Sequence, residues 1–364
     1  MNKKYVIAAV VFGMMVSHTA HAATDLLFKS VKQMGMGGAG IATAKNVDAL
    51  ILNPAGLASS SRFKLDLLDF YIGASPDMIN KKDDIEKLFK GDLTISQVQA
   101  ITPLSFTGHA GGGFGFGWRG FGVGVASRAV FDGALSNPTS PTVQYQAIAD
   151  TQLAVGKSFN QELLAKDWVV GVSGKFVSRR QFASSISNAQ LVSFLATSSD
   201  LPTSEQSRSG FGIDLGAKTD ASIPFIGEAS VGLSAQNIGL TLTGDGADET
   251  IPFKLGAGVA FKSNFPGLIP VVSTVLSNWE VAADYYVISD NTGFMKNLHI
   301  GAEKRILWNR ILFRGGLNQG FFVGGGSFDL FLVKVHYNYF KEALGDSIDD
   351  DQVDFHTLGF EIGL

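Results

Sequence analysis

The chain has 364 residues, a formal net charge of −4, no cysteine, and unusually many glycines (43) and phenylalanines (28). The slightly acidic balance offers no electrostatic footprint for nucleic acid, and the missing cysteines exclude disulfides and a lipid-modified cysteine anchor. Mean hydropathy is +0.18 without any long apolar stretch beyond the first residues, which excludes helical membrane spans and leaves alternating strands as the membrane-compatible arrangement.

The first 22 residues have the three parts of a secretory signal peptide. Lys3 and Lys4 form a basic start, an apolar core follows over 5–16, and Ala20-His21-Ala22 is a small-x-small cleavage site. The apolar core is shorter than the roughly 20 residues that a transmembrane helix needs. We therefore expect an exported protein that is cleaved after Ala22.

The stretch "GMGGAGIATAKNVDALILNPAGLA" (35–58) matches the dinucleotide-binding pattern G-x-G-x-x-G at Gly35, Gly37 and Gly40. That motif needs a buried strand before it, a helix after it, and an acidic residue about 20 positions further on. Here two lysines and no β-branched run precede the glycines, and Asp48 follows the last of them by only eight positions. We reject the nucleotide-binding interpretation, so the glycines need another explanation.

From residue 62 onward, apolar and polar residues alternate in fourteen segments, which predicts an all-β, transmembrane antiparallel barrel. Alternation also fits a soluble β-sandwich. Aromatic residues near the segment ends, charges of both signs on the polar faces, and hydrophobic residues at alternate positions of the last segment favour the barrel. We expect strands at 62–73, 113–118, 121–131, 144–158, 167–181, 209–219, 229–241, 252–262, 277–289, 296–303, 310–317, 320–327, 329–340 and 353–364.

The connections between these strands alternate in length. The first, third, fifth, seventh and thirteenth are mostly long, whereas the even ones are mostly shorter, with 263–276 as the exception. Bacterial barrels have short periplasmic turns and long external loops, so the N-terminus is expected in the periplasm. Residues 74–101 carry apolar side chains at helical spacing after Ser75 or Asp77, which predicts an external helix, either over the barrel mouth or without function.

Residues 35–58 closely resemble the N-terminal signature of the FadL-like outer-membrane family of hydrophobic-compound transporters, and of the related PorV-like and UPF0164-type proteins. Later stretches such as "SVGLSAQNIG" and "IPFKLGAGVAF" look like the PorV-like branch. The resemblance implies a fourteen-stranded barrel with an N-terminal hatch folded into its lumen. The division would then be a signal peptide (1–22), a hatch segment (23–61) and the barrel (62–364).

Hatch residues that the resemblance implies are glycines able to approach the wall closely, an acidic residue, and an N-P-A-G turn. These residues are Gly37, Gly38, Gly40, Asp48, Asn53, Pro54, Ala55 and Gly56. The alternative is a plug that seals the barrel without gating it. A second glycine cluster contains Gly120, Gly122 and Gly124, which mark either a wall kink that opens a lateral hole, as in the fatty-acid transporters, or tight packing of the hatch.

No G-x-S-x-G, H-E-x-x-H or P-loop motif is present, so we expect no enzymatic activity, no cofactor and no metal. His299 and His336 fall on the polar faces, where a hydrogen-bonded lumen histidine is expected. The acidic run 346–354 is expected to be a solvated loop. A mixed-charge lumen lining is predicted from Lys175, Lys254, Glu280, Asp284, Glu303, Arg314, Lys334 and Glu361.

Together with the period-two pattern, the resemblance implies a channel or transporter in the outer membrane of a Gram-negative-type (diderm) bacterium. It would pass hydrophobic or amphipathic molecules, long-chain fatty acid-like ones among them, with the hatch as gate. The alternative is a PorV-like structural or secretion-shuttle barrel that holds a protein partner. The hatch-like segment argues against a simple aqueous porin. Expected partners are outer-membrane lipid, a hydrophobic ligand and the barrel-assembly machinery, with a monomeric barrel and no nucleic acid.

Overall fold

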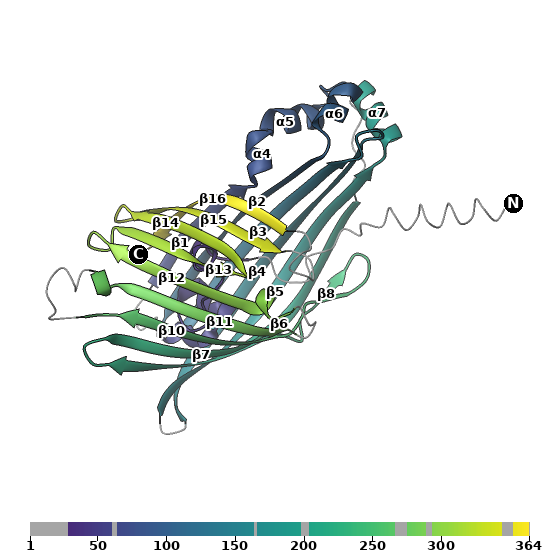
Figure 1. Ribbon diagram of the computed structural model, residues 1–364. Helices are drawn as coiled ribbons and strands as arrows, with labels where there is room; N and C mark the ends of the chain where they lie inside the picture. The colour runs from purple at the N-terminus through teal and green to yellow at the C-terminus, as the bar shows by residue number, and fades with distance from the viewer. Residues whose placement is uncertain are drawn as a thin grey trace.

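The computed structural model describes residues 28–59, 64–163, 166–197, 204–265, 275–288, 293–343 and 352–363. The predicted signal peptide (1–22) and the chain end at Leu364 lie outside these residues. Sixteen strands form one antiparallel sheet, and the pairing of β5 with β6 closes it into a barrel (Figure 1). Two short strands, β8 (Thr241–Gly244) and β9 (Glu249–Thr250), form a side hairpin, which leaves fourteen strands in the wall.

The expected fourteen-stranded barrel is therefore confirmed, with each expected segment inside a wall strand or overlapping one. The wall strands are β1 (Lys64–Ala74), β2 (Leu104–Trp118), β3 (Phe121–Ser136), β4 (Thr142–Leu163), β5 (Lys166–Ile186), β6 (Ser204–Ile223), β7 (Gly227–Ile238), β10 (Lys254–Ser263), β11 (Trp279–Ile288), β12 (Leu298–Ile306), β13 (Ile311–Asn318), β14 (Phe321–Asp329), β15 (Val333–Ala343) and β16 (Gln352–Gly363).

Several expected boundaries are wrong, and two of them have a clear cause. β2 begins at Leu104 instead of residue 113, because the glycines of this strand have no side chains to reveal a period of two although their backbones pair with β1. The third connection is 137–141 instead of 132–143, since β3 and β4 both extend beyond the expected ends. Strands β2 to β6 have 15 to 22 residues, whereas β12 to β14 have only 8 or 9, so one side of the barrel is much taller.

The two ends of the barrel differ in the length of the connections between strands. At one end, here called the turn end, short connections join β2 to β3, β6 to β7, β12 to β13 and β14 to β15. The opposite end, the loop end, carries the helices gathered at the top of Figure 1. In outer-membrane barrels the short turns face the periplasm, which assigns the turn end to that side.

Residues 74–101 form three helices where one was expected: α4 (Pro76–Asn80), α5 (Lys82–Lys90) and α6 (Ile95–Ile101). The predicted cap is confirmed at Ser75, whose hydroxyl accepts the backbone N–H of Met78 at 3.3 Å. A further helix, α7 (Asn188–Thr197), packs with them on the tall strands around Phe106. Among the described residues, no helix is both long and apolar enough to cross a membrane.

Side chains of the wall alternate between an exposed apolar outer face and a largely polar, buried inner face. On β11, for example, Trp279, Val281 and Val287 are exposed outward, whereas Glu280 and Asp284 are buried inside. A closed barrel leaves no unpaired sheet edge in the hydrocarbon layer, and the exposed outer side chains are favourable there only against lipid. The chain is an outer-membrane β-barrel of a diderm bacterium.

The N-terminal segment (residues 28–59), purple in Figure 1, lies inside the barrel. It contains α2 (Val31–Gly35), α3 (Asn46–Leu52) and a 3₁₀ helix, η1 (Pro54–Ser59). Helix α2 contacts β13 to β15, whereas α3 and η1 contact strands β1 to β7. Because these strands lie on opposite sides of the wall, the segment crosses the lumen.

Candidate functional site

Glycines allow the N-terminal segment to touch the backbone of the wall. Gly37 has a φ of +65°, and a Cβ there would lie 2.4 Å from the carbonyl oxygen of Ile300. Gly38 has a φ of +84°, and its Cβ would lie 2.5 Å from Nδ1 of His299. The wall contributes glycines too, since a Cβ on Gly301 would lie 2.2 Å from the oxygen of Met36. Close approach to the wall explains why residues 37 and 38 are glycines. The match of this stretch to the nucleotide-binding pattern is therefore a coincidence of sequence.

Gly40 is held by an acidic residue of the wall. The backbone N–H groups of Gly40 and Ile41 donate to Oδ2 of Asp284 at 2.6 and 2.8 Å. The Asp284 side chain is 1% exposed, and its other oxygen has no hydrogen-bond partner among the described residues. Two charge-assisted hydrogen bonds therefore fix the middle of the N-terminal segment to β11.

Asn53 and Pro54 form the turn that the N-P-A-G motif predicts. The Asn53 side chain accepts the N–H of Ala55 at 3.1 Å and donates to the carbonyl oxygen of Ile41 at 3.0 Å. This amide therefore links two parts of the N-terminal segment while being fully buried. Gly56 completes the turn, since a Cβ there would lie 2.2 Å from the oxygen of Ala44.

Asp48 bonds to another part of the N-terminal segment. Its carboxylate accepts the hydroxyl of Ser30 at 3.0 Å, and Ser30 also caps α2. Asp48 thus connects α3 to α2 within the N-terminal segment, and it lines the cavity described below.

Polar wall side chains that the sequence did not single out complete the attachment. Asn338 donates to the oxygen of Val31 at 3.1 Å. Gln236 donates to that of Leu52 at 2.7 Å on the other side of the lumen. Isolated amides on a polar strand face give no sequence signal, because any lumen-facing position accepts them. Ser173 and the Lys29–Glu342 ion pair also join the segment to the wall. His299, which the sequence predicted as a hydrogen-bonded lumen histidine, lies 2.9 Å from the oxygen of Gly37.

The three glycines proposed as a wall kink lie on and beside β3. Gly120 sits in the β2–β3 turn with a φ of +74°. A Cβ on Gly122 would lie 2.6 Å from Leu57, and one on Gly124 would lie 3.1 Å from Leu50. The pairing of β3 with both neighbours runs through these positions without a register shift. The geometry therefore matches the alternative of tight packing against the N-terminal segment.

The predicted lumen charges lie on the inner face and are mostly paired. Lys175 lies 2.8 Å from Asp214, and Lys254 lies over the ring of Tyr286 at 5.8 Å. The remaining pairs are Glu280 with Lys32 (2.5 Å), Glu303 with Arg314 and Arg305 (2.7 Å each), and Lys334 with Glu361 (2.5 Å).

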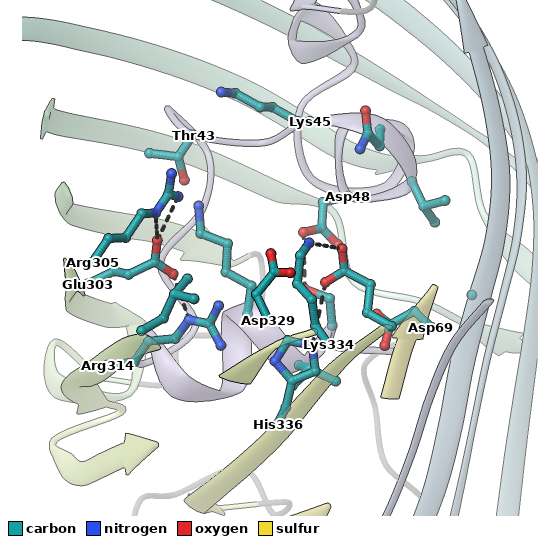
Figure 2. Close-up of a pocket in the computed structure, with 18 of the residues that line it drawn as sticks. Thr43, Lys45, Asp48, Asp69, Glu303, Arg305, Arg314, Asp329, Lys334 and His336 are labelled. Carbon is teal, nitrogen blue, oxygen red and sulfur yellow. Dashed lines mark hydrogen bonds and ion pairs between the residues drawn. The ribbon is translucent and has the colours of Figure 1, made fainter. Parts of the chain in front are cut away.

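A cavity of about 320 Å³, here called the vestibule, separates the N-terminal segment from the short strands at the turn end. Figure 2 shows Glu303, Arg305 and Arg314 gathered on one side of it. Lys45 enters from the N-terminal segment, and burial together with the nearby ammonium of Lys32 lowers its pKa. The vestibule is therefore lined both by charged groups and by apolar side chains such as Phe28, Val47 and Leu312.

A second element enters the lumen from the loop end. The β8–β9 hairpin lies on the inner face of β6, where a Cβ on Gly210 would lie 2.1 Å from the oxygen of Thr241. Glu249 of this hairpin pairs with Arg179 at 2.5 Å and with Arg208 at 3.1 Å. Arg179 is itself bound by Asp150 at 2.7 Å. The sequence predicted an external loop here, because nothing local shows that a loop folds inward.

Several solved structures are similar to this chain over nearly its whole length. The toluene transporter TbuX from Ralstonia pickettii covers 92% of this chain and 97% of its own, at 16% identity and a TM-score of 0.50. The monoaromatic hydrocarbon channel CymD covers 91% and 96%, at 12% identity and a TM-score of 0.49. The toluene transporter TodX from P. putida covers 93% and 97%, at 12% identity and a TM-score of 0.45.

No protein-family model matches the chain, and no curated protein matches it. The similarity to TbuX shows that the two chains share a fold. The fold that the resemblance to the FadL-like family implied is therefore confirmed.

Proposed function

We propose that this barrel passes hydrophobic or amphipathic small molecules, such as long-chain fatty acid-like compounds, across the outer membrane. In this proposal the N-terminal segment is a hatch that opens and closes the lumen. The division into a signal peptide (1–22), a hatch (23–61) and a barrel (62–364) belongs to the same proposal. It is supported by the described segment ending at Ser59 and the wall beginning at Lys64.

The observation that carries the proposal is the interface between the N-terminal segment and the wall. It consists of glycine contacts, separate hydrogen bonds such as those of Gln236 and Asn338, the charge-assisted bonds of Asp284, the ion pairs of Lys29 and Lys32, and apolar packing around Met34 and Leu50. Each ordinary hydrogen bond contributes a net stabilisation of only about 0.5–1.5 kcal/mol, because water replaces the lost partner. Parts of the segment can therefore move without unfolding the closed wall.

Two further observations support a transported ligand. TbuX, which shares the fold, is described as a toluene transporter. The vestibule with Lys45 and Arg305 provides charged groups next to the hatch, which favours ligands that carry a polar head on an apolar body. No covalent chemistry is part of this proposal.

A monomer inserted by the barrel-assembly machinery is also proposed. The β5–β6 pairing closes the sheet, so no strand edge remains in the wall for a second copy. The apolar faces of α5 to α7 are packed against Phe106 and its neighbours. This packing gives the PorV-like alternative, in which the loops hold a protein, no specific support.

Uptake by reconstituted vesicles tests the proposal. Entry of laurate and of toluene is measured with the wild-type protein, with empty vesicles, and with a variant that lacks residues 28–59. We expect entry above that of empty vesicles for the wild type, and a large ion leak only in the deletion variant. Entry equal to that of empty vesicles for both compounds would reject transport, and a protein chain retained on the loops would favour the shuttle role.

A further inference from the structure

Arg179 and Arg208 lie directly opposite each other on the inner faces of β5 and β6. Like charges opposite each other on neighbouring strands repel, so this arrangement needs an anion between them. Glu249 of the β8–β9 hairpin supplies it. Its Oε1 accepts from Nη1 of Arg179 at 2.5 Å, and its Oε2 accepts from Nη1 of Arg208 at 3.1 Å. One carboxylate that belongs to neither strand therefore bridges the two arginines.

Both arginines are also oriented by contacts within the wall. Nε and Nη2 of Arg179 donate to the two carboxylate oxygens of Asp150 at 2.7 Å each. Nη2 of Arg208 donates to the amide oxygen of Gln206 at 2.6 Å. The two Nη1 groups thus converge on one point whether or not Glu249 is there. Charged donors that are already in position bind a carboxylate with little loss of conformational freedom.

The charges of the wall leave one positive charge for Glu249. Asp150 neutralises one of the two arginines. Arg128, which lies opposite Asp150 on β3, is paired with Glu342 at 2.6 Å. The second arginine is therefore balanced by the hairpin. A ligand head with a single negative charge fits this balance, whereas a neutral head would leave a buried charge without its partner.

The hairpin that carries Glu249 is a small unit with a closed base. Nδ2 of Asn237 donates to the oxygen of Pro252 at 2.9 Å, which ties the two ends of the hairpin together. Its ladder with β6 has two residue pairs, and the backbone N–H of Asp245 donates to the oxygen of Ser207 at 3.0 Å. β8 and β9 have four and two residues, and a lone two-stranded hairpin is marginally stable. The hairpin can therefore leave the wall as one piece when these contacts are weakened.

Apolar side chains lie next to the arginines, under the hairpin. Val177 precedes Arg179 by one inward-facing position on β5, and it packs with Leu240, Leu242 and Ile251. All four apolar side chains are at most 1% exposed. Movement of the hairpin would uncover Val177 at the same time as it frees the two arginines. An anion site and an apolar surface would then lie side by side.

A buried amide beside this surface has no hydrogen-bond partner. Gln152 of β4 lies opposite Val177 and is 1% exposed. Neither its amide oxygen nor its amide nitrogen has a partner among the described residues. Buried polar side chains are nearly always hydrogen-bonded. The amide of Gln152 is therefore a group that the closed hairpin leaves unused and that a polar ligand head can satisfy.

We propose that the β8–β9 hairpin is a second gate, at the loop end, and that Glu249 is an internal stand-in for the carboxylate of an acidic amphiphile. The carboxylate of the ligand takes the place of Glu249 on Arg179 and Arg208. Its alkyl chain takes the place of the hairpin leucines on Val177, and the hairpin moves away from the wall. The inference rests on the proposed transport function, and it adds a gate that selects acidic over neutral compounds.

Binding of octanoate tests the competition with Glu249. The full protein is held in lipid nanodiscs, and binding is measured by isothermal titration calorimetry against empty nanodiscs. Glu249→Gln weakens the internal competitor, so we expect octanoate to bind several-fold tighter than to the wild type. Arg208→Gln removes a receptor group, so we expect several-fold weaker binding. The controls Glu86→Gln on α5 and Arg180→Gln on the outer face of β5 make the same charge changes elsewhere and should match the wild type.

The same titration states what would overturn the proposal. Unchanged octanoate affinity in Glu249→Gln would overturn the competition, because a merely structural glutamate predicts no gain in affinity. Unchanged affinity in Arg208→Gln would overturn the site. Octanol that binds as tightly as octanoate would overturn the need for a charge. Octyl phosphate carries more than one negative charge at neutral pH, so tighter binding of this compound would overturn the single-charge assignment.

Movement of the hairpin is tested by the distance between two spin labels. The chain has no cysteine, so Ala247→Cys at the hairpin tip and Thr139→Cys on the β3–β4 loop place one label each. We expect the distance distribution to change with octanoate and to stay the same with octanol. An unchanged distribution at saturating octanoate would overturn the gate. Octanoate binding without uptake of laurate would reject transport and leave this site intact, whereas uptake without octanoate binding would reject only this inference.

Discussion

Oδ2 of Asp284, on the inner face of β11, accepts the backbone N–H of Gly40 at 2.6 Å and that of Ile41 at 2.8 Å. The carboxylate is almost completely buried, and no cation pairs with it among the described residues. Its charge is therefore stabilised chiefly by the two amides of the N-terminal segment. Of all the described contacts between segment and wall, this one is the most direct test of the hatch.

Replacing Asp284 with alanine should loosen the N-terminal segment. Hydrogen bonds to a charged group are worth about 1.5–3 kcal/mol each, so the loss of both should total about 3–6 kcal/mol of attachment. We expect faster hydrogen exchange in the peptide that contains Gly40 and larger conductance steps in planar bilayers. Asp220→Ala, at an exposed acid near the turn end, should change neither measurement. Unchanged exchange in the Asp284 variant would show that the segment is held by its other contacts.

Gly38→Leu should disturb the segment for two independent reasons. A side chain would be strained at a φ of +84° and would collide with His299. The matched control is Gly174→Leu on β5, where nothing lies within 4 Å of the added Cβ. Conductance and uptake of a hydrophobic dye should change in the first variant and stay at the wild-type level in the second. A Gly38 variant that behaves as the wild type in both assays, with a folded barrel, would contradict the hatch role.

Glu249→Gln should release the β8–β9 hairpin from the inner wall. The substitution removes the carboxylate that joins Arg179 and Arg208. Because Arg179 keeps Asp150 as a partner, we expect a loss of about 1.5–3 kcal/mol, that of a hydrogen bond to a charged group. Limited proteolysis should then cut within 241–250 faster than in the wild type. Glu86→Gln on α5, which removes a fully exposed ion pair with Lys90, should leave the cleavage rate unchanged.

Equal cleavage of the Glu249 variant and the wild type would mean that the apolar contacts of Leu240 and Leu242 alone retain the hairpin.

Val259→Arg and Ile79→Arg compare two side chains of similar exposure in different surroundings. Val259 is 55% exposed in the middle of β10, and Ile79 is 47% exposed on α4. A lipid-facing arginine near the bilayer centre costs about 2–4 kcal/mol, whereas one in water costs almost nothing. Only Val259→Arg should reduce the fraction of protein that migrates differently before and after boiling. Equal fractions for the two variants would place Val259 outside the lipid belt.

Local patterns predicted the wall because a strand exposes alternate residues to two different surroundings. Phe360 and Glu361 illustrate this, since one faces outward and the other pairs with Lys334 inside. The same rule failed at Gly111 and Gly112, where residues without side chains carry no alternation although their backbones pair with β1.

The sequence by itself determined the barrel, its strand number and the N-P-A-G turn, because alternation and turn chemistry act over a few neighbouring residues. Only the tertiary structure decided which wall group meets each part of the N-terminal segment. Asp284 and Gly40 are 244 positions apart, and their contact depends on how the closed wall orients β11 around the lumen. The inward fold of Glu249 is decided in the same way, by the closure of the barrel around the lumen.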